Sequence, residues 1–127
     1  MFTVEEKRFF CNTAIGAREL SNSGAPQGAV VVRGKQILSF GYSRKVVRKR
    51  EYEISGIYDA VFGARDANLI GAVLFSTCFP SLNDLVLILS VGITSIYFMG
   101  EINDSKAVDL INCTKEDDIP LEMIKLE

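Results

Sequence analysis

The order of apolar segments along the chain constrains the fold more than any other feature of this sequence. Segments with the spacing of an amphipathic helix alternate with short apolar runs that are typical of buried strands. The expected helices cover residues 4–22, 54–66, 82–90 and 105–112, and the expected strands cover residues 28–32, 36–42, 70–78, 94–99 and 121–126. A tight turn joins the first two strands, whereas helices connect the later ones. The pattern therefore predicts an α/β fold of three α-β-α layers: a mixed five-stranded sheet with an antiparallel first hairpin and helices on both faces.

Length and composition limit the class of protein further. A chain of 127 residues, 48% of them hydrophobic, has the size of one domain with its own core, so we expect a single domain over residues 1–127. No apolar run approaches the roughly 18 residues of a membrane span, and the first residues lack the pattern of a secretion signal. Three widely separated cysteines, Cys11, Cys78 and Cys113, are expected to be unpaired and buried, which favours a reducing, cytoplasmic setting. The chain contains no histidine, which excludes histidine metal ligands, Ser-His-Asp triads and Cys-His dyads.

The charges are distributed unevenly along the chain. Residues 1–50 hold ten Lys and Arg against three Asp and Glu, and residues 101–127 hold three against eight. We call residues 44–50 the basic segment, because it contains Arg44, Lys45, Arg48, Lys49 and Arg50. Mutual repulsion among these cations predicts a solvated loop. With Tyr42 and Tyr52 at its ends as stacking platforms, the same loop is a candidate contact for phosphate or nucleic acid.

Several segments in uninterrupted order carry a resemblance to a known family. They are GAVVV at residues 28–32 with ILSFGYS at 37–43, FGAR at 62–65, GAVLFSTCFP at 71–80 and SVGITSIYF at 90–98. Together these segments resemble the cytidine deaminase superfamily, most closely its deoxycytidylate and tRNA-adenosine deaminase branches. The resemblance covers residues 5–100, and residues 101–127 form an acidic helix–strand tail. It implies the three-layer fold that the segment order also predicts.

The resemblance also implies a catalytic site, and this chain departs from it at every signature position. Deaminases of this superfamily bind zinc through a histidine or cysteine and the two cysteines of a PCxxC motif, and a glutamate two residues after the first ligand transfers protons. Alignment on the shared segments places Ile54 at the first ligand, Gly56 at the glutamate, and Ser81 and Asp84 at the two cysteines. Ser43 takes the place of an asparagine that holds the nucleotide. We therefore expect no metal, no cofactor and no deamination, and a former pocket that Ile54 fills in part.

Two functions of different classes follow. Deaminases of this superfamily assemble as oligomers through helices beside the active site, and such assemblies can include an inactive subunit. The expected helix at 82–90 is apolar on most of its faces, so Leu82, Leu85, Val86 and Leu89 are candidates for an interface, with a central core helix as the alternative reading. The first hypothesis is thus a catalytically inactive interaction or regulatory protein that binds a second copy or another protein. The second is a nucleic-acid or nucleotide-binding module that uses the basic segment.

A third reading is an unrelated activity on the same scaffold. Its candidate polar residues are Ser43, Asp59, Ser81, Asn83 and Asp84. No pair of them forms a recognisable acid–base or nucleophile arrangement, and helix capping accounts for Ser81 and Asp84. An inactive member of this superfamily also suits a viral or phage origin, in which a gene for nucleotide metabolism has been reassigned to binding.

Overall fold

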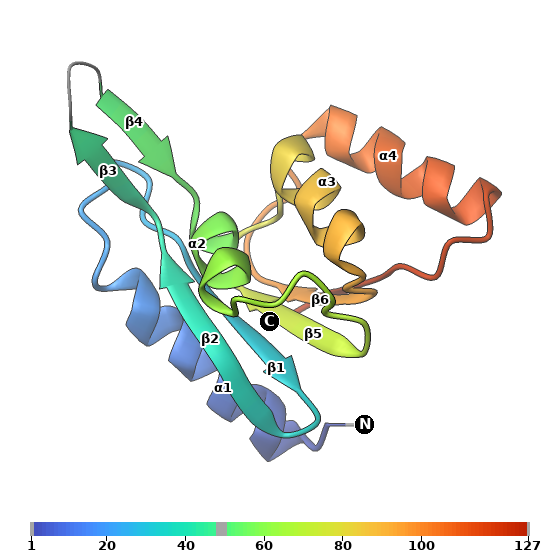
Figure 1. The fold of residues 1–127 in the computed structure, drawn as a ribbon, viewed down its shortest axis with the longest axis horizontal. Coiled ribbons are helices and arrows are strands. Elements are labelled where there is room, and N and C mark those ends of the chain that lie inside the picture. The colour runs from blue at the N-terminus through green and yellow to red at the C-terminus, as the bar shows by residue number, and fades with distance from the viewer. Residues whose placement is uncertain (1, 48–50, 127) are drawn as a thin grey trace.

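A mixed five-stranded sheet forms the centre of the molecule (Figure 1). The computed structural model describes residues 2–47 and 51–126. The sheet contains β1 (Gly28–Arg33), β2 (Gln36–Tyr42), β5 (Ala72–Ser76), β6 (Ser95–Phe98) and β7 (Glu122–Lys125), in the spatial order β2-β1-β5-β6-β7. β1 pairs antiparallel with both β2 and β5, whereas β5–β6 and β6–β7 are parallel pairs. The expected sheet, with its antiparallel first hairpin, is confirmed.

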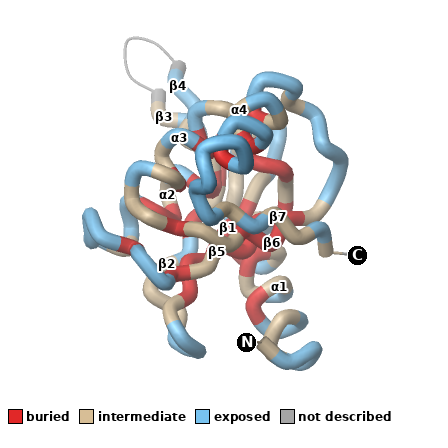
Figure 2. The backbone as a smooth tube through the Cα atoms, turned by 90° about the vertical axis from the view of Figure 1, so that its right-hand side faces the viewer, coloured by how far each residue is buried: buried red, intermediate tan, exposed pale blue. Residues whose placement is uncertain are grey.

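Helices cover both faces of this sheet. α1 (Val4–Arg18) packs against β1, β2 and β5 on one face. α2 (Gly56–Gly63), α3 (Leu82–Val91) and α4 (Ser105–Glu116) contribute to the core on the other face. Figure 2 shows the sheet between α1 on one side and the other helices on the opposite side. None of the described helices has both the length and the apolar character that a membrane crossing requires.

Side chains of β1 point alternately into two cores. Ala29 and Val31 lie in the larger core with α2, α3 and α4, and Val30 and Val32 lie in the smaller core with α1. All four are fully buried. Because burial of one valine side chain contributes about 1.5–3 kcal/mol, this continuous apolar run fixes the central strand between two helical layers.

The basic segment is the largest difference from the expected structure. Instead of a solvated loop, its described part is β3 (Arg44–Val47), which pairs antiparallel with β4 (Glu51–Ile54) in a separate two-stranded sheet. Lys45 lies opposite Glu53 in this pair, and opposite charges across two strands stabilise the pairing rather than repel. The remaining cations of the segment, Arg48, Lys49 and Arg50, lie outside the described residues.

Several smaller expectations are also corrected. The helix expected from residue 54 begins at Gly56, because Ile54 belongs to β4, and it ends at Gly63. The first helix ends at Arg18, and α4 continues to Glu116. The three cysteines are unpaired as expected, but none is fully buried: Cys11 and Cys78 are half-buried, and Cys113 is exposed on α4.

Candidate functional site

The first turns of α2 and α3 meet at a hollow of about 470 Å³ on the surface. The residues that line it are Glu53, Ile54, Ser55, Tyr58, Ser81, Asn83 and Asp84. Three positions that the resemblance assigns to metal ligands, Ile54, Ser81 and Asp84, are thus brought together from two segments almost thirty residues apart in the chain. The structure thus shows these three residues around one hollow, and their assignment to a catalytic site stays a prediction of the alignment.

Asp84 joins the two helices at this hollow. Its Oδ1 accepts a hydrogen bond of 2.6 Å from the Ser55 hydroxyl, and Ser55 is the N-cap of α2. Its Oδ2 accepts a bond of 3.3 Å from the Ser81 backbone N–H, and the Ser81 hydroxyl accepts one of 3.2 Å from the Asp84 N–H. This reciprocal pair is a capping box at the start of α3, as the spacing of Ser81 and Asp84 predicts. The carboxylate is 94% buried within this network.

Gly56, which the alignment assigns to the proton-transferring glutamate, has little space beside it for a side chain. A Cβ atom built on Gly56 would lie 3.1 Å from the backbone carbon and oxygen of Gln27. The Gly56 N–H also donates a bond of 3.3 Å to the Gln27 side-chain oxygen. Any side chain at this position must therefore displace backbone, so the start of α2 is built around a glycine.

These residues do not fit a zinc ion. Ile54 has no donor atom, and the Asp84 and Ser81 oxygens already accept the hydrogen bonds that cap α3. Zinc sites require three protein donors, mostly nitrogen or sulfur. Cys78 lies nearby in the chain, but burial raises the pKa of its thiol and so disfavours the thiolate that binds metal. Within residues 2–47 and 51–126, no group of three Cys, Asp or Glu side chains has a geometry that could hold a metal.

Ser43 has a structural role. It is buried, and its hydroxyl accepts a bond of 2.8 Å from the Gln27 N–H. The Ser21 hydroxyl lies 2.8 Å from the Ser43 hydroxyl and donates to the Ser43 carbonyl at 2.5 Å. Ser43 therefore links the chain after α1 to the end of β2, rather than lining the hollow between α2 and α3.

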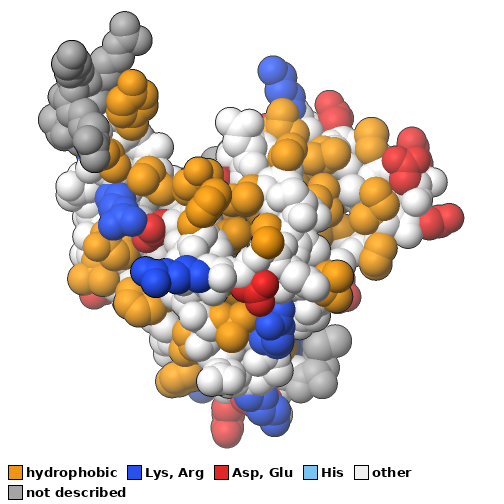
Figure 3. Space-filling view, viewed as in Figure 1, with side chains coloured by type: hydrophobic (Ala, Val, Ile, Leu, Met, Phe, Trp, Pro, Cys, Tyr) orange, Lys and Arg blue, Asp and Glu red, His pale blue; other side chains and the backbone are white. Residues whose placement is uncertain are grey.

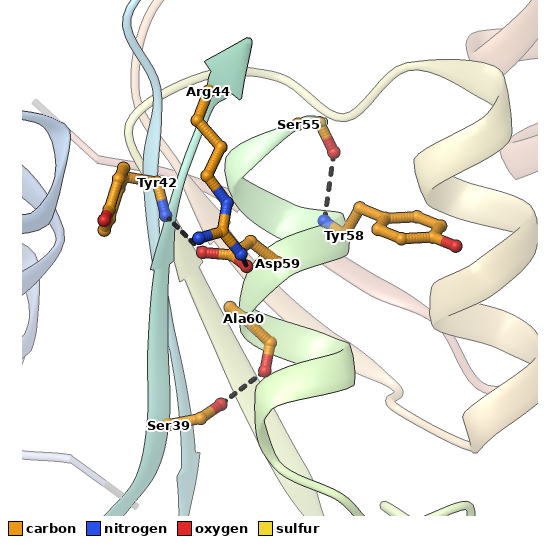
Figure 4. A network of polar contacts seen from close by, with 7 residues as sticks. All are labelled: Ser39, Tyr42, Arg44, Ser55, Tyr58, Asp59 and Ala60. Carbon is orange, nitrogen blue, oxygen red and sulfur yellow. Dashed lines mark hydrogen bonds and ion pairs between the residues drawn. The ribbon is translucent and has the colours of Figure 1, made fainter. Parts of the chain in front are cut away.

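A second polar network involves the start of the basic segment (Figure 4). Arg44 forms an ion pair of 2.5 Å with Asp59 on α2, and the other Asp59 oxygen accepts a bond of 3.2 Å from the Tyr42 N–H. The Arg44 guanidinium also lies 5.6 Å from the centre of the Tyr42 ring. Asp59 therefore secures α2 against β2 and β3. Tyr52 is 57% exposed on β4.

The predicted interface residues on α3 differ in exposure. Leu85 is fully buried in the core, so this part of the interface prediction is wrong. Leu82 and Leu89 are half-buried, and Val86 is 54% exposed. One side of α3 therefore belongs to the core, and another side is exposed to solvent. This split follows from the 3.6-residue period of the helix, which places Leu85 and Ile88 on the side that faces the core and Val86 on another side.

Exposed aromatic residues on α2 extend this surface, which the sequence analysis did not identify. Tyr58 and Phe62 stack with their ring centres 4.4 Å apart, and both are exposed. Phe62 and Leu87 line one apolar hollow between the two helices. We call Tyr58, Phe62, Val86 and Leu87 the α2–α3 face. Figure 3 shows hydrophobic side chains gathered over this part of the molecule.

Three residues of the site have only weak sequence signals. Ser55 is detectable as an N-cap before an apolar helical run, but its bond to Asp84 spans 29 residues. Gln27 reaches the start of α2 over a similar separation. Asp104 caps α4 and also accepts a bond of 3.0 Å from the Leu82 N–H, so it joins the starts of α3 and α4. Backbone hydrogen bonds from Ala107 and Leu82 lower the pKa of Asp104.

Comparison with known proteins shows similarity to solved structures but to no family model or curated sequence. Among solved structures, the dCMP deaminase from the cyanophage S-TIM5, in complex with dCMP and dUMP, is similar with a TM-score of 0.81 at 19% identity, over 99% of this chain and 100% of that one. The diaminohydroxyphosphoribosylaminopyrimidine deaminase/5-amino-6-(5-phosphoribosylamino)uracil reductase from Thermotoga maritima gives a TM-score of 0.75 at 21% identity, over 95% of this chain and 36% of that one.

A third similar structure is the guanine deaminase from Bacillus subtilis, with a TM-score of 0.57 at 16% identity, over 87% of this chain and 70% of that one. Three enzymes with different substrates in their names thus share one architecture with this chain. The chain has the cytidine deaminase-like fold, and at these identities the likeness extends to the fold alone.

Proposed function

We propose that this chain is a catalytically inactive protein with a deaminase fold, acting as an interaction or regulatory subunit. The observation that carries the proposal is the hollow between α2 and α3. Ile54, Ser81 and Asp84 line this hollow, and hydrogen bonds join the last two. The alignment assigns these three residues to the zinc ligands and assigns Gly56, at the start of α2, to the glutamate. Without three zinc donors there is no metal to activate water, and without the glutamate there is no group to transfer its protons.

The α2–α3 face supports a role in protein association. Tyr58, Phe62 and Val86 expose roughly half of their area, and Phe62 and Leu87 border a hollow of about 290 Å³. Exposed aromatic side chains around a hollow are typical of interface centres. We expect this face to bind a second copy of the chain or another protein. Its position beside the former catalytic hollow would allow the chain to influence an active partner.

Metal content and activity test the first half of the proposal. We expect the purified full chain to contain no stoichiometric zinc by elemental analysis and to leave dCMP unchanged after prolonged incubation. Zinc that remains at one ion per chain after dialysis, together with conversion of dCMP to dUMP, would refute it. Restoring the signature with Ile54→His, Gly56→Glu, Ser81→Cys and Asp84→Cys is a further arm, in which we expect poor folding because Gly56 has no room for a side chain.

Light scattering tests the second half. We expect Phe62→Asp to dissociate a complex that the unmodified chain forms with itself or with a purified partner, because a carboxylate in a desolvated interface is strongly unfavourable. Leu20→Asp is the matched control, since Leu20 is 59% exposed and lies outside the α2–α3 face. A monomeric chain without a partner, or equal effects of the two variants, would contradict the interaction role.

The alternative, a nucleic-acid-binding module, has less support among the described residues. Arg44 is neutralised by Asp59, and Lys45 lies opposite Glu53 in the β3–β4 pair. Unpaired cations that reach phosphates provide most of the affinity for nucleic acid.

We also propose an intracellular setting, because all three cysteines are unpaired. A viral or phage origin agrees with the likeness to the cyanophage enzyme.

A further inference from the structure

A groove runs along the side of α1 that does not face the sheet. It has a volume of about 390 Å³ and is bordered by Met99 and Leu126, the residues that directly follow β6 and β7. Its apolar lining comes from Val4, Ile15, Met99 and Leu126, with Cys11 beside Met99 at an S–S separation of 3.4 Å. Lys7, Arg8 and Asn12 complete the lining. We call this feature the α1 groove.

The lining residues of α1 form a continuous helical stripe. Positions 4, 7, 8, 11, 12 and 15 repeat at intervals of three and four, so they share one side of the helix. A different stripe, formed by Phe10, Ala14 and Ala17, is buried against the sheet. α1 thus presents two faces with helix-packing spacing, and in the described part of the chain only one of them is covered.

The charge of the α1 groove sets it apart. Lys7 and Arg8 are its only charged lining residues, and neither lies within ion-pair distance of a carboxylate among the described residues. By contrast, four hollows elsewhere on the described surface each have an acidic residue in their lining, namely Asp66, Asp84, Glu53 or Asp104. The α1 groove is therefore suited to a ligand that brings carboxylates and an apolar surface together.

The sheet leaves room for a helix at this place. α1 packs against β1, β2 and β5, and the described part of the chain places no second helix beside it over β6 and β7 (Figure 2). On that face Ile124 and Leu126 are only half-buried, with Phe2 packed over Tyr97 at a ring distance of 6.2 Å. Helices that pack side by side have axes 8–10 Å apart, which is the spacing such a neighbour of α1 would take.

We propose that the α1 groove binds an amphipathic acidic helix from a partner protein. The apolar stripe of the partner helix would contact Val4, Ile15 and Met99, and its Asp or Glu side chains would pair with Lys7 and Arg8. This surface lies on the opposite side of the sheet from the α2–α3 face. The proposal is therefore independent of the proposed function and survives if the α2–α3 face binds nothing.

A helix suits the groove better than a membrane or a nucleic acid does. Membrane recognition by basic residues typically uses clusters of four to eight cations, and nucleic-acid binding uses several phosphate contacts. The groove offers two cations beside apolar residues of α1 and of the segments that follow β6 and β7. Helix-in-groove recognition requires this combination of a few apolar anchors and flanking charge.

Peptide selection against the full chain tests the proposal. We would display random peptides of about 14 residues, roughly four helical turns, and select on the unmodified protein with counter-selection on the Lys7→Glu/Arg8→Glu variant. We expect enrichment of apolar residues at intervals of three and four, with an excess of Asp and Glu. Fluorescence anisotropy of an enriched peptide should show affinity that falls about tenfold on Lys7→Glu/Arg8→Glu and falls further at high salt.

Matched variants separate the groove from general effects of charge. Lys106→Glu/Lys115→Glu makes the same change of charge on exposed α4 residues across the sheet, and we expect less than about a twofold effect on peptide affinity. Arg8→Glu alone keeps the Lys7 contact with the Tyr97 ring and should still weaken binding. Val4→Asp tests the apolar lining, since Val4 is 70% exposed and contributes little to the core.

Four results would overturn the proposal. Enriched peptides without acidic excess would remove the charge argument, as would equal affinity for the unmodified chain and the Lys7→Glu/Arg8→Glu variant. Binding to phosphatidylserine vesicles that this variant abolishes would assign the groove to a membrane surface. Self-association that it abolishes, but that Phe62→Asp does not, would assign the groove to a second copy of the chain.

Discussion

Replacement of Asp84 by alanine should destabilise the fold measurably, because one buried carboxylate joins the starts of two helices. The Ser55 hydroxyl would lose its acceptor at 2.6 Å, and the Ser81 N–H would lose its acceptor at 3.3 Å. A hydrogen bond to a charged group contributes about 1.5–3 kcal/mol, and a capping interaction about 0.5–1 kcal/mol. Water can reach Ser55, which is only half-buried, so the lower part of the range applies. We expect a loss of about 2 kcal/mol in the free energy of unfolding.

Chemical denaturation and thermal melting measure this effect. For a domain of this size, about 2 kcal/mol corresponds to a decrease in Tm of roughly 6–10 °C. Asp109→Ala on the exposed side of α4 is the matched control and should change stability by less than about 0.5 kcal/mol. A double-mutant cycle with Ser55→Ala should give a coupling of about 1 kcal/mol, because the two side chains are in direct contact.

Thermal melting with added zinc tests whether the Asp84 carboxylate caps the helices or binds metal. We expect the Tm of the unmodified chain to be the same with added zinc and with a chelator. A ligand present at a hundred times its Kd stabilises a protein by about 2.7 kcal/mol, so zinc binding at this site would be readily visible. The reasoning fails if zinc raises the Tm and Asp84→Ala abolishes that rise, or if Asp84→Ala leaves stability unchanged.

Three further predictions follow from the same structure. Gly56→Ala should lower the free energy of unfolding by about 1 kcal/mol or more in denaturant melts, because its Cβ would lie 3.1 Å from the Gln27 backbone. Gly63→Ala in the same helix has its nearest contact at 3.6 Å and should be neutral or stabilising, so the reverse order of stability would contradict the geometry. Asp104 has a lowered pKa in the folded chain, so its contribution to folding stability is present above the ordinary Asp pKa and is lost as the pH falls through the lowered value. In melts across this acid range, the stability difference between the unmodified chain and Asp104→Asn should shrink as the pH falls, and a constant difference would refute this prediction. Exchange of the five cations of the basic segment for Gln should leave the affinity for single-stranded oligonucleotides little changed in anisotropy measurements, if Arg44 stays paired with Asp59 and Lys45 stays opposite Glu53. A large loss of affinity with a steep salt dependence would favour the nucleic-acid alternative.

Local patterns predicted most of the architecture. The run GAVVV reads as a strand buried on both faces, and β1 is that strand. Ser81 and Asp84 at the start of an apolar run predict an N-cap with an acidic first turn, and the structure contains both as a capping box. In each case the physical cause acts between residues close together in the chain, so the sequence carries the information directly.

Contacts between distant segments account for what the sequence did not predict. The basic segment was expected to be a loop because its own charges repel. In its described part, Asp59 pairs with Arg44 and Glu53 lies opposite Lys45, and both carboxylates come from elsewhere in the chain. Leu85 and Val86 are adjacent and equally apolar, yet one is buried and the other exposed, which depends on where α3 lies against the core. The Ser55–Asp84 bond likewise exists only because the fold places two helix starts together.

The identity of residue 84 follows from the electrostatics of that meeting point. The starts of α2 and α3 converge, and each helix start carries a partial positive charge of about half a unit. Two such ends in a partly buried hollow repel each other unless an anion lies between them. An aspartate at position 84 supplies that anion, caps its own helix and reaches the cap of the other. A neutral residue there would leave this repulsion uncompensated, so the arrangement of the two helix starts favours a carboxylate at position 84.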